Sequence, residues 1–130
     1  MQRITKGRNV IYSIRCSASL ITQTHILSAA HCFFDEKTGE KRENVDDLLV
    51  VLGSNDPINS GEGIERSIKN FSVHWRYIYP LAYLDVAIAT LNQTIPKTAY
   101  KTIRPICLPP YYDGENDDPG HNLTLHICKI

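Results

Sequence analysis

Six short apolar or alternating runs, separated by turn-rich segments, most strongly constrain how these 130 residues fold. Short runs bounded by turn-forming residues are typical of β-strands, and six of them suit one small closed barrel. We therefore expect an all-β fold, an antiparallel six-stranded barrel with no repeat and no second domain. The expected strands are Val10–Ile14, Ala18–Thr22, His25–Ala29, Leu48–Leu52, Ile64–Val73 and Val86–Leu91.

The charge balance and the hydropathy pattern narrow the classes of partner. Fourteen Lys and Arg oppose fourteen Asp and Glu, so the formal net charge is zero. A neutral chain offers no long-range attraction to nucleic acid or to an anionic membrane. No apolar run approaches the roughly 20 residues of a membrane span, and the first twenty residues contain no hydrophobic export signal. We expect neither nucleic acid nor a membrane as a partner.

One histidine and one aspartate stand out as candidates for proton-transfer chemistry. His31 lies in a Ser-Ala-Ala-His-Cys segment directly after an expected strand. A histidine side chain titrates near neutral pH and is the commonest general base in enzymes. Asp85 opens an apolar run, where a buried carboxylate needs a proton donor as a partner. The other four histidines, His25, His74, His121 and His126, have no comparable context.

These two segments resemble the histidine and aspartate motifs of the trypsin-like (chymotrypsin-family, S1) serine endopeptidases. Two further stretches are similar to family motifs: residues 15–22 to a Cys-Gly-Gly-Ser-Leu-Ile-Ser stretch, and residues 103–109 to an Ile/Val-Arg-Pro-x-Cys-Leu-Pro stretch. The four motifs occur in the family's order between about Arg15 and Pro109, with a fainter match at residues 126–130. The resemblance implies that His31 is the general base of a catalytic triad and that Asp85 orients it.

The resemblance also assigns roles to the four cysteines. It implies a disulfide between Cys16 and Cys32, which would hold His31 in place and contribute roughly 3 kcal/mol in the chain-entropy model. Cys107 resembles a position that ties the catalytic domain to a propeptide or light chain, and Cys128 one whose partner lies in a second barrel. These two cysteines could be free, pair with each other, or pair with another chain.

The family's nucleophile is not found in these residues. It lies in a Gly-Asp-Ser-Gly-Gly segment downstream of the aspartate, whereas every serine of this chain precedes Asp85. We therefore expect residues 1–130 to be a partial S1 peptidase domain, the N-terminal half of a trypsin-like double-barrel fold with the second barrel missing. Without the nucleophile and the oxyanion hole, such a chain should hydrolyse peptides negligibly.

The expected function is that of a serine-type endopeptidase with a His/Asp/Ser triad, truncated before the serine. The alternative is a non-catalytic secreted binding or regulatory module derived from a serine protease, and a third possibility is an incomplete gene model. The expected partners are a protein or peptide substrate, or a protease inhibitor, if a second barrel completes the site. We expect no cofactor, and no metal either, because no Cys-x-x-Cys or His-x-x-x-His spacing is present.

The expected location is extracellular, although we expect no signal peptide within these residues. Family resemblance and cysteine usage both indicate an oxidising compartment. Three Asn-x-Ser/Thr glycosylation triplets, at Asn70, Asn92 and Asn122, are consistent with secretion.

Overall fold

A computed structural model describes residues 1–6 and 9–108 of the chain. This described part contains seven β-strands, two short 3-10 helices and no α-helix, which confirms the predicted all-β class. The 3-10 helices are η1 (Ala30–Phe33) and η2 (Lys97–Lys101). The strands are β1 (Gln2–Lys6), β2 (Asn9–Ser13), β3 (Ala18–Leu20), β4 (His25–Ser28), β5 (Leu49–Leu52), β6 (Ile64–Val73) and β7 (Ala87–Leu91).

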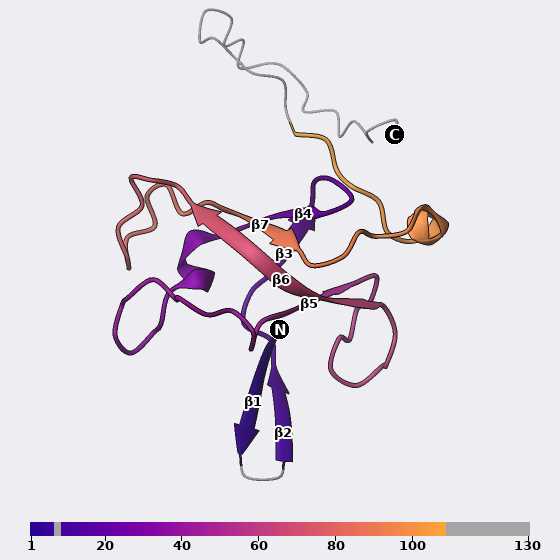
Figure 1. The fold of residues 1–130 in the computed structure, drawn as a ribbon, viewed down its shortest axis with the longest axis horizontal. Coiled ribbons are helices and arrows are strands. Elements are labelled where there is room, and N and C mark those ends of the chain that lie inside the picture. The colour runs from indigo at the N-terminus through magenta and orange to yellow at the C-terminus, as the bar shows by residue number, and fades with distance from the viewer. Residues whose placement is uncertain (7–8, 109–130) are drawn as a thin grey trace, which may run out of the picture.

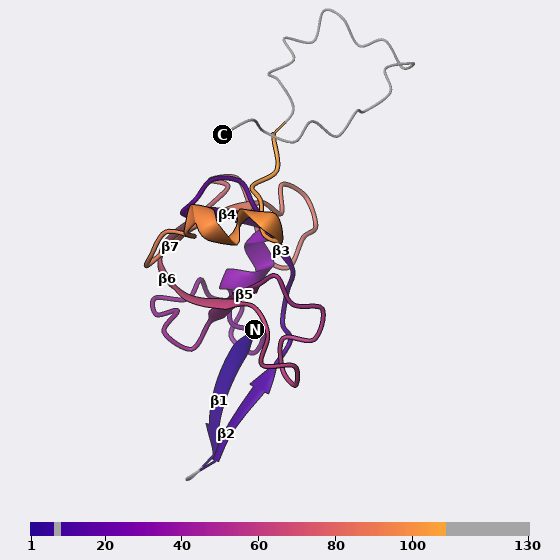
Figure 2. The same cartoon turned by 90° about the vertical axis from the view of Figure 1, so that its right-hand side faces the viewer.

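Five of the strands form one curled antiparallel sheet in the order β3-β4-β7-β6-β5 (Figure 1). Strand β7 lies at its centre, pairing Ile26 of β4 with Ala89 on one side and Phe71 of β6 with Ala89 on the other. Strands β1 and β2 form a separate hairpin that projects away from the sheet in both views (Figure 2). The central position of β7 brings the loop before it, which contains Asp85, next to the end of β4, which leads to His31.

The predicted six-stranded barrel is not seen, because the sheet contains five strands. The expected strand at residues 10–14 corresponds to β2, which pairs with β1 rather than continuing directly into β3. The hairpin reaches the sheet through a bridge between Gln2 and Leu48 and a hydrogen bond of 2.8 Å from the Met1 amine to the Leu49 carbonyl. A cavity of about 400 Å³ remains between the edge strands β3 and β5, lined by residues that include Leu20 and Val50.

The core lies on the concave side of this sheet. The alternation of buried and exposed residues explains why these segments form strands. Along β7, Ala87, Ala89 and Leu91 are buried while Ile88 is exposed, the alternation expected of a strand with one face against the core. Burial of apolar side chains is the main favourable contribution to folding. The remaining buried members of the core are Leu20, Ile26, Ala30, Cys32, Phe33, Val45, Leu48, Ile68, Tyr77, Ile95 and Ile103.

Gly53 directly follows β5 and is required there by its backbone and its neighbour. Its φ is +77°, and a Cβ at this position would lie 2.8 Å from two carbons of the buried Ile103 side chain. We expect Gly53→Ala to lower the free energy of unfolding by about 2 kcal/mol, from left-handed strain plus overlap. Gly61 is the matched control, since its φ is +64° and a Cβ there would meet nothing within 4 Å. For Gly61→Ala we expect the free energy of unfolding to fall by about 1 kcal/mol. Urea unfolding measures the loss in both variants, and equal losses would contradict the packing argument.

Within the described residues, no helix has the length and apolar character needed to cross a membrane.

Candidate active site

His31 is the second residue of η1 and is positioned by the packing of this short helix. Strand β4 leads into η1, and its Ile26 side chain is buried in the core. At the other end of the helix, Phe33 is 2 % exposed and stacks on Phe71 of β6, with ring centroids 4.4 Å apart. Because Ala30, Cys32 and Phe33 all point into the core, the His31 side chain is directed outward. It is 52 % exposed and accessible to a reactant.

Asp85 lies just before β7, after an unusual backbone conformation. Leu84 has a φ of 57°, the only positive φ of a non-glycine residue in the described ranges. Bulky residues adopt this left-handed region rarely and at an energetic cost. The Val86 amide donates to the Leu84 carbonyl at 2.8 Å, which closes a tight turn around Asp85. The turn directs the Asp85 carboxylate toward η1.

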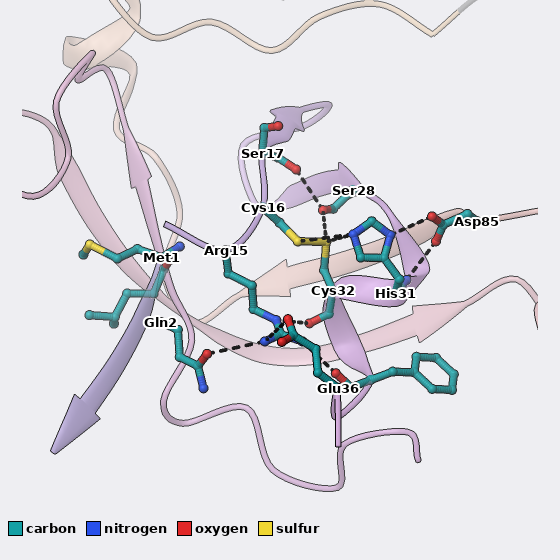
Figure 3. Close-up of a disulfide and its surroundings, with 12 residues drawn as sticks. Met1, Gln2, Arg15, Cys16, Ser17, Ser28, His31, Cys32, Glu36 and Asp85 are labelled. Carbon is teal, nitrogen blue, oxygen red and sulfur yellow. Dashed lines mark hydrogen bonds and ion pairs between the residues drawn. A yellow bond between two sulfur atoms is a disulfide. The ribbon is translucent and has the colours of Figure 1, made fainter. Parts of the chain in front are cut away.

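The Asp85 carboxylate accepts two hydrogen bonds from His31 (Figure 3). Oδ1 lies 2.8 Å from the His31 backbone nitrogen, and Oδ2 lies 2.7 Å from Nδ1 of the imidazole. Two bonds to one residue fix both the position of the backbone and the rotation of the ring. The structure therefore brings together the two side chains that the sequence singles out, 54 positions apart.

The environment of Asp85 keeps its carboxyl ionised. Burial alone would raise the pKa of this group, but the hydrogen bonds from His31, the charge of His31 and the Ala30 backbone together lower the pKa below its usual 3.8. An ionised carboxylate only accepts hydrogen bonds, so Nδ1 of His31 carries a proton and, in the neutral ring, Nε2 keeps its lone pair. Nearby Tyr77 has a raised pKa, because of its own burial first and then the charge of Asp85.

The lowered pKa of Asp85 predicts an acid-dependent contribution to stability. A carboxyl whose pKa is lower in the folded state stabilises the fold above its unfolded pKa of about 3.8 and loses this effect as the pH falls through the folded pKa. We expect the parent chain to be more stable than Asp85→Asn near neutral pH and this difference to shrink below pH 3.8. Denaturant unfolding at a series of pH values measures the difference, and a constant difference down to strong acid would contradict the prediction.

The disulfide predicted between Cys16 and Cys32 is confirmed, with an S–S distance of 2.04 Å. Its two sulfur atoms lie 3.8 Å and 3.7 Å from Nε2 of His31. Cys16, His31 and Cys32 form the one grouping of possible metal-binding atoms within the described part of the chain. Both sulfur atoms are in the disulfide, which leaves no thiolate to bind a metal ion.

The remaining cysteines are only partly described. Cys107 is disulfide-bonded. Cys128, together with the fainter motif at residues 126–130, lies outside the residues that the structure describes. The alternative in which Cys107 is free is therefore wrong.

Comparison with protein families identifies the family to which this chain belongs. The family model described as Trypsin matches residues 2–124. The chain belongs to the trypsin-like serine protease family. The match begins earlier and ends later than the four motifs between Arg15 and Pro109, and it includes the β1–β2 hairpin.

Several trypsin-like relatives show similarity over most of this chain. The atrial natriuretic peptide-converting enzyme of Homo sapiens is 35% identical over 95 residues, covering 72% of this chain and 8% of the relative. The proclotting enzyme of Tachypleus tridentatus is 30% identical over 102 residues, with coverages of 76% and 26%. Transmembrane protease serine 11B of Homo sapiens is 36% identical over 104 residues, with coverages of 80% and 21%. The matched regions span about a quarter or less of these relatives.

Two residues around the pair were not predicted from the sequence. Arg15 forms hydrogen bonds with the C-terminal end of η1. In the sequence it precedes Cys16 and has no feature that indicates this role. Leu84 adopts a left-handed conformation, for which Gly or Asn would have been the signal. The catalytic roles of His31 and Asp85 stay predictions at this point.

Proposed function

We propose that this chain is the histidine- and aspartate-bearing part of a trypsin-like serine endopeptidase, with His31 as general base and Asp85 as the residue that orients it. The observation that carries the proposal is the double hydrogen bond from His31 to Asp85, with Nδ1 at 2.7 Å from the carboxylate. Structural ion pairs between histidine and aspartate also occur in proteins. Membership of the trypsin-like family and the outward direction of the His31 ring favour the catalytic role.

The geometry supports a definite proton path for cleavage of a peptide bond. A serine hydroxyl attacks the peptide carbonyl carbon while Nε2 of His31 takes its proton, and Asp85 stabilises the resulting imidazolium through Nδ1. The tetrahedral intermediate breaks its C–N bond as His31 returns that proton to the leaving amine. Water then hydrolyses the acyl-enzyme by the same route in reverse, with His31 as the base. Asp85 holds the ring throughout and is not itself protonated.

The serine of this mechanism would come from polypeptide outside these residues. The eight serines of the chain all precede Asp85, and none lies in a Gly-Asp-Ser-Gly-Gly context. A surface hollow of about 330 Å³ adjoins Asp85 and is lined also by Ser17, Leu27 and Ser28. This hollow lies beside Asp85, and the half-exposed His31 ring is likewise open to additional polypeptide. We propose that residues 1–130 form a partial domain which a second barrel completes.

The proposal has consequences for substrate and location. Peptide bonds of proteins are the substrate class that this mechanism serves, and a protease inhibitor is a further partner once the second barrel is present. The disulfide between Cys16 and Cys32 supports a site outside the reducing cytosol. We therefore propose an extracellular or secreted enzyme.

A fluorophosphonate probe, which reacts covalently with an activated serine, tests this assignment. We expect no labelling of the 130-residue chain alone, and labelling of a folded polypeptide in which these residues are joined to a Gly-Asp-Ser-Gly-Gly segment. Labelling of the isolated chain would contradict the assignment of the nucleophile to other polypeptide. A folded, complete polypeptide that stays unlabelled would contradict the protease function and favour a non-catalytic module.

A further inference from the structure

The side chain of Arg15 lies where the β2–β3 connection meets η1, and it is only 12 % exposed. Its guanidinium donates from Nη2 to the Phe34 carbonyl at 2.8 Å and from Nε to the Cys32 carbonyl at 3.3 Å (Figure 3). Nη1 lies 3.0 Å from Oε1 of Glu36. Arg15 therefore contacts two backbone carbonyls and one side chain within the five residues that follow His31.

The two carbonyl groups are the ones that a short helix leaves without partners. The last carbonyls of a helix have no intrahelical donor and carry partial negative charge. A guanidinium satisfies them well, because its donors form a rigid planar fork with a permanent positive charge. At the other end of η1, Ala29 makes no side-chain cap, and the Asp85 carboxylate accepts from the His31 backbone amide instead. Arg15 is thus the side chain that bonds the C-terminal end of η1, as Asp85 bonds its N-terminal end.

The bonds to the carbonyls matter more than the ion pair with Glu36. The Glu36 side chain is 72 % exposed, and exposed ion pairs contribute little to stability. The two carbonyl bonds are shielded by the nearly buried Arg15 side chain, and hydrogen bonds to a charged group are stronger than neutral ones. This contrast makes Glu36 a suitable control position.

One set of contacts holds His31, and a second set holds the residue that follows it. Asp85 holds its backbone amide and its imidazole from the loop before β7. Arg15 and the adjacent Cys16 hold the next residue, Cys32, through a carbonyl bond and a disulfide. The disulfide joins η1 to the β2–β3 connection at one point, and the Arg15 fork adds two hydrogen bonds between the same two segments.

We infer that Arg15 is a positioning residue for the His31–Asp85 pair, acting by fixing the orientation of η1. This inference rests on the proposed function for its importance to catalysis, but its structural content is independent of any activity. Without the fork, the C-terminal end of η1 loses two of the bonds that fix it, and the bond between Nδ1 of His31 and the Asp85 carboxylate opens more often. In the complete protease such a loosening should lower kcat more than it changes KM, since it acts on the base that takes the serine proton.

The proton on Nδ1 of His31 provides a direct readout in the 130-residue chain. The exchange of this proton with water can be followed in the low-field region of the proton NMR spectrum. This exchange is slow only while Nδ1 is hydrogen-bonded to Asp85. We expect Arg15→Met to accelerate this exchange about tenfold, because the charge-assisted bonds to both carbonyls are lost. We expect Arg15→Lys to resemble Arg15→Met, since one ammonium group keeps the charge but not the fork. Glu36→Gln removes the ion pair alone and should leave the exchange at the parental rate.

The outcomes separate positioning from other roles. An Arg15→Met chain that folds and exchanges at the parental rate overturns the inference, as does an effect of Glu36→Gln equal to that of Arg15→Met. If Arg15→Met does not fold, a folded Arg15→Lys chain with parental exchange overturns it equally. If neither variant folds, Arg15 is needed for the fold as a whole and the restricted role is wrong. None of these results depends on proteolysis, so an unlabelled complete polypeptide would refute the proposed function while leaving this test valid.

Discussion

In the complete protease that we propose, replacing Asp85 by Asn is expected to lower kcat by about 10⁴-fold, the size known for this change in Ser-His-Asp triads. The asparagine amide donates where the carboxylate accepts, so it stabilises the His31 tautomer whose proton lies on Nε2. That tautomer has no lone pair facing the serine and no longer serves as a base. Steady-state hydrolysis of a peptide substrate measures the effect, which should fall on kcat rather than KM.

The matched control for this substitution is Asp56→Asn. Asp56 is also a carboxylate with a lowered pKa, caused chiefly by hydrogen bonds from the Asn59 backbone and side chain in an exposed turn. It makes no contact with His31 among the described hydrogen bonds, so we expect kcat to stay at the parental value. Equal activity of the Asp85→Asn enzyme and the parent would show that the pair is a structural contact only.

Removal of the disulfide is the second large effect that we expect. The double substitution Cys16→Ala and Cys32→Ala opens a loop with a sequence separation of 16 and should lower the free energy of unfolding by about 3 kcal/mol. For a domain of this size, that loss lowers the melting temperature by roughly 10 °C. Thermal unfolding followed by circular dichroism measures it. Alanine is the suitable replacement because Cys32 is 5% exposed and a polar side chain would be buried there.

Ser28→Ala provides the comparison for the disulfide. The Ser28 hydroxyl donates to the Ser17 carbonyl at 2.9 Å and lies 3.7 Å from the Cys32 sulfur, so this change disturbs the same neighbourhood while keeping the disulfide. We expect a loss of about 1 kcal/mol, the usual value for one hydrogen bond. If the double cysteine variant loses no more than Ser28→Ala, the crosslink does not stabilise the fold as argued.

The strands of the sheet were predictable because their hydrophobic pattern is local. Ile64–Val73 was predicted with the bounds that β6 has, and the expected strand His25–Ala29 differs from β4 by one residue. Strand β1 was missed because its sequence, Gln-Arg-Ile-Thr-Lys, contains a single apolar residue. Its pairing with β2 depends on a partner strand rather than on its own pattern, and propensity is a weak guide in that case.

The site was predictable to the extent that it depends on motifs. His31 and Asp85 were found through their sequence context and are brought within 2.7 Å of each other. The contacts that hold them were not predictable, because Arg15 reaches the carbonyls of Cys32 and Phe34 only once β2, β3 and η1 have assembled. The positive φ of Leu84 is similarly imposed by the surrounding structure on a residue that does not favour it.

The measurement that most directly tests this account is the proton NMR spectrum of His31 in the 130-residue chain. The account predicts a low-field resonance from the proton shared between Nδ1 and the Asp85 carboxylate, which disappears in Asp85→Asn and persists in Asp56→Asn. A folded chain that lacks this resonance, or one in which Asp85→Asn leaves it unchanged, would contradict the central claim that Asp85 orients His31 for proton transfer.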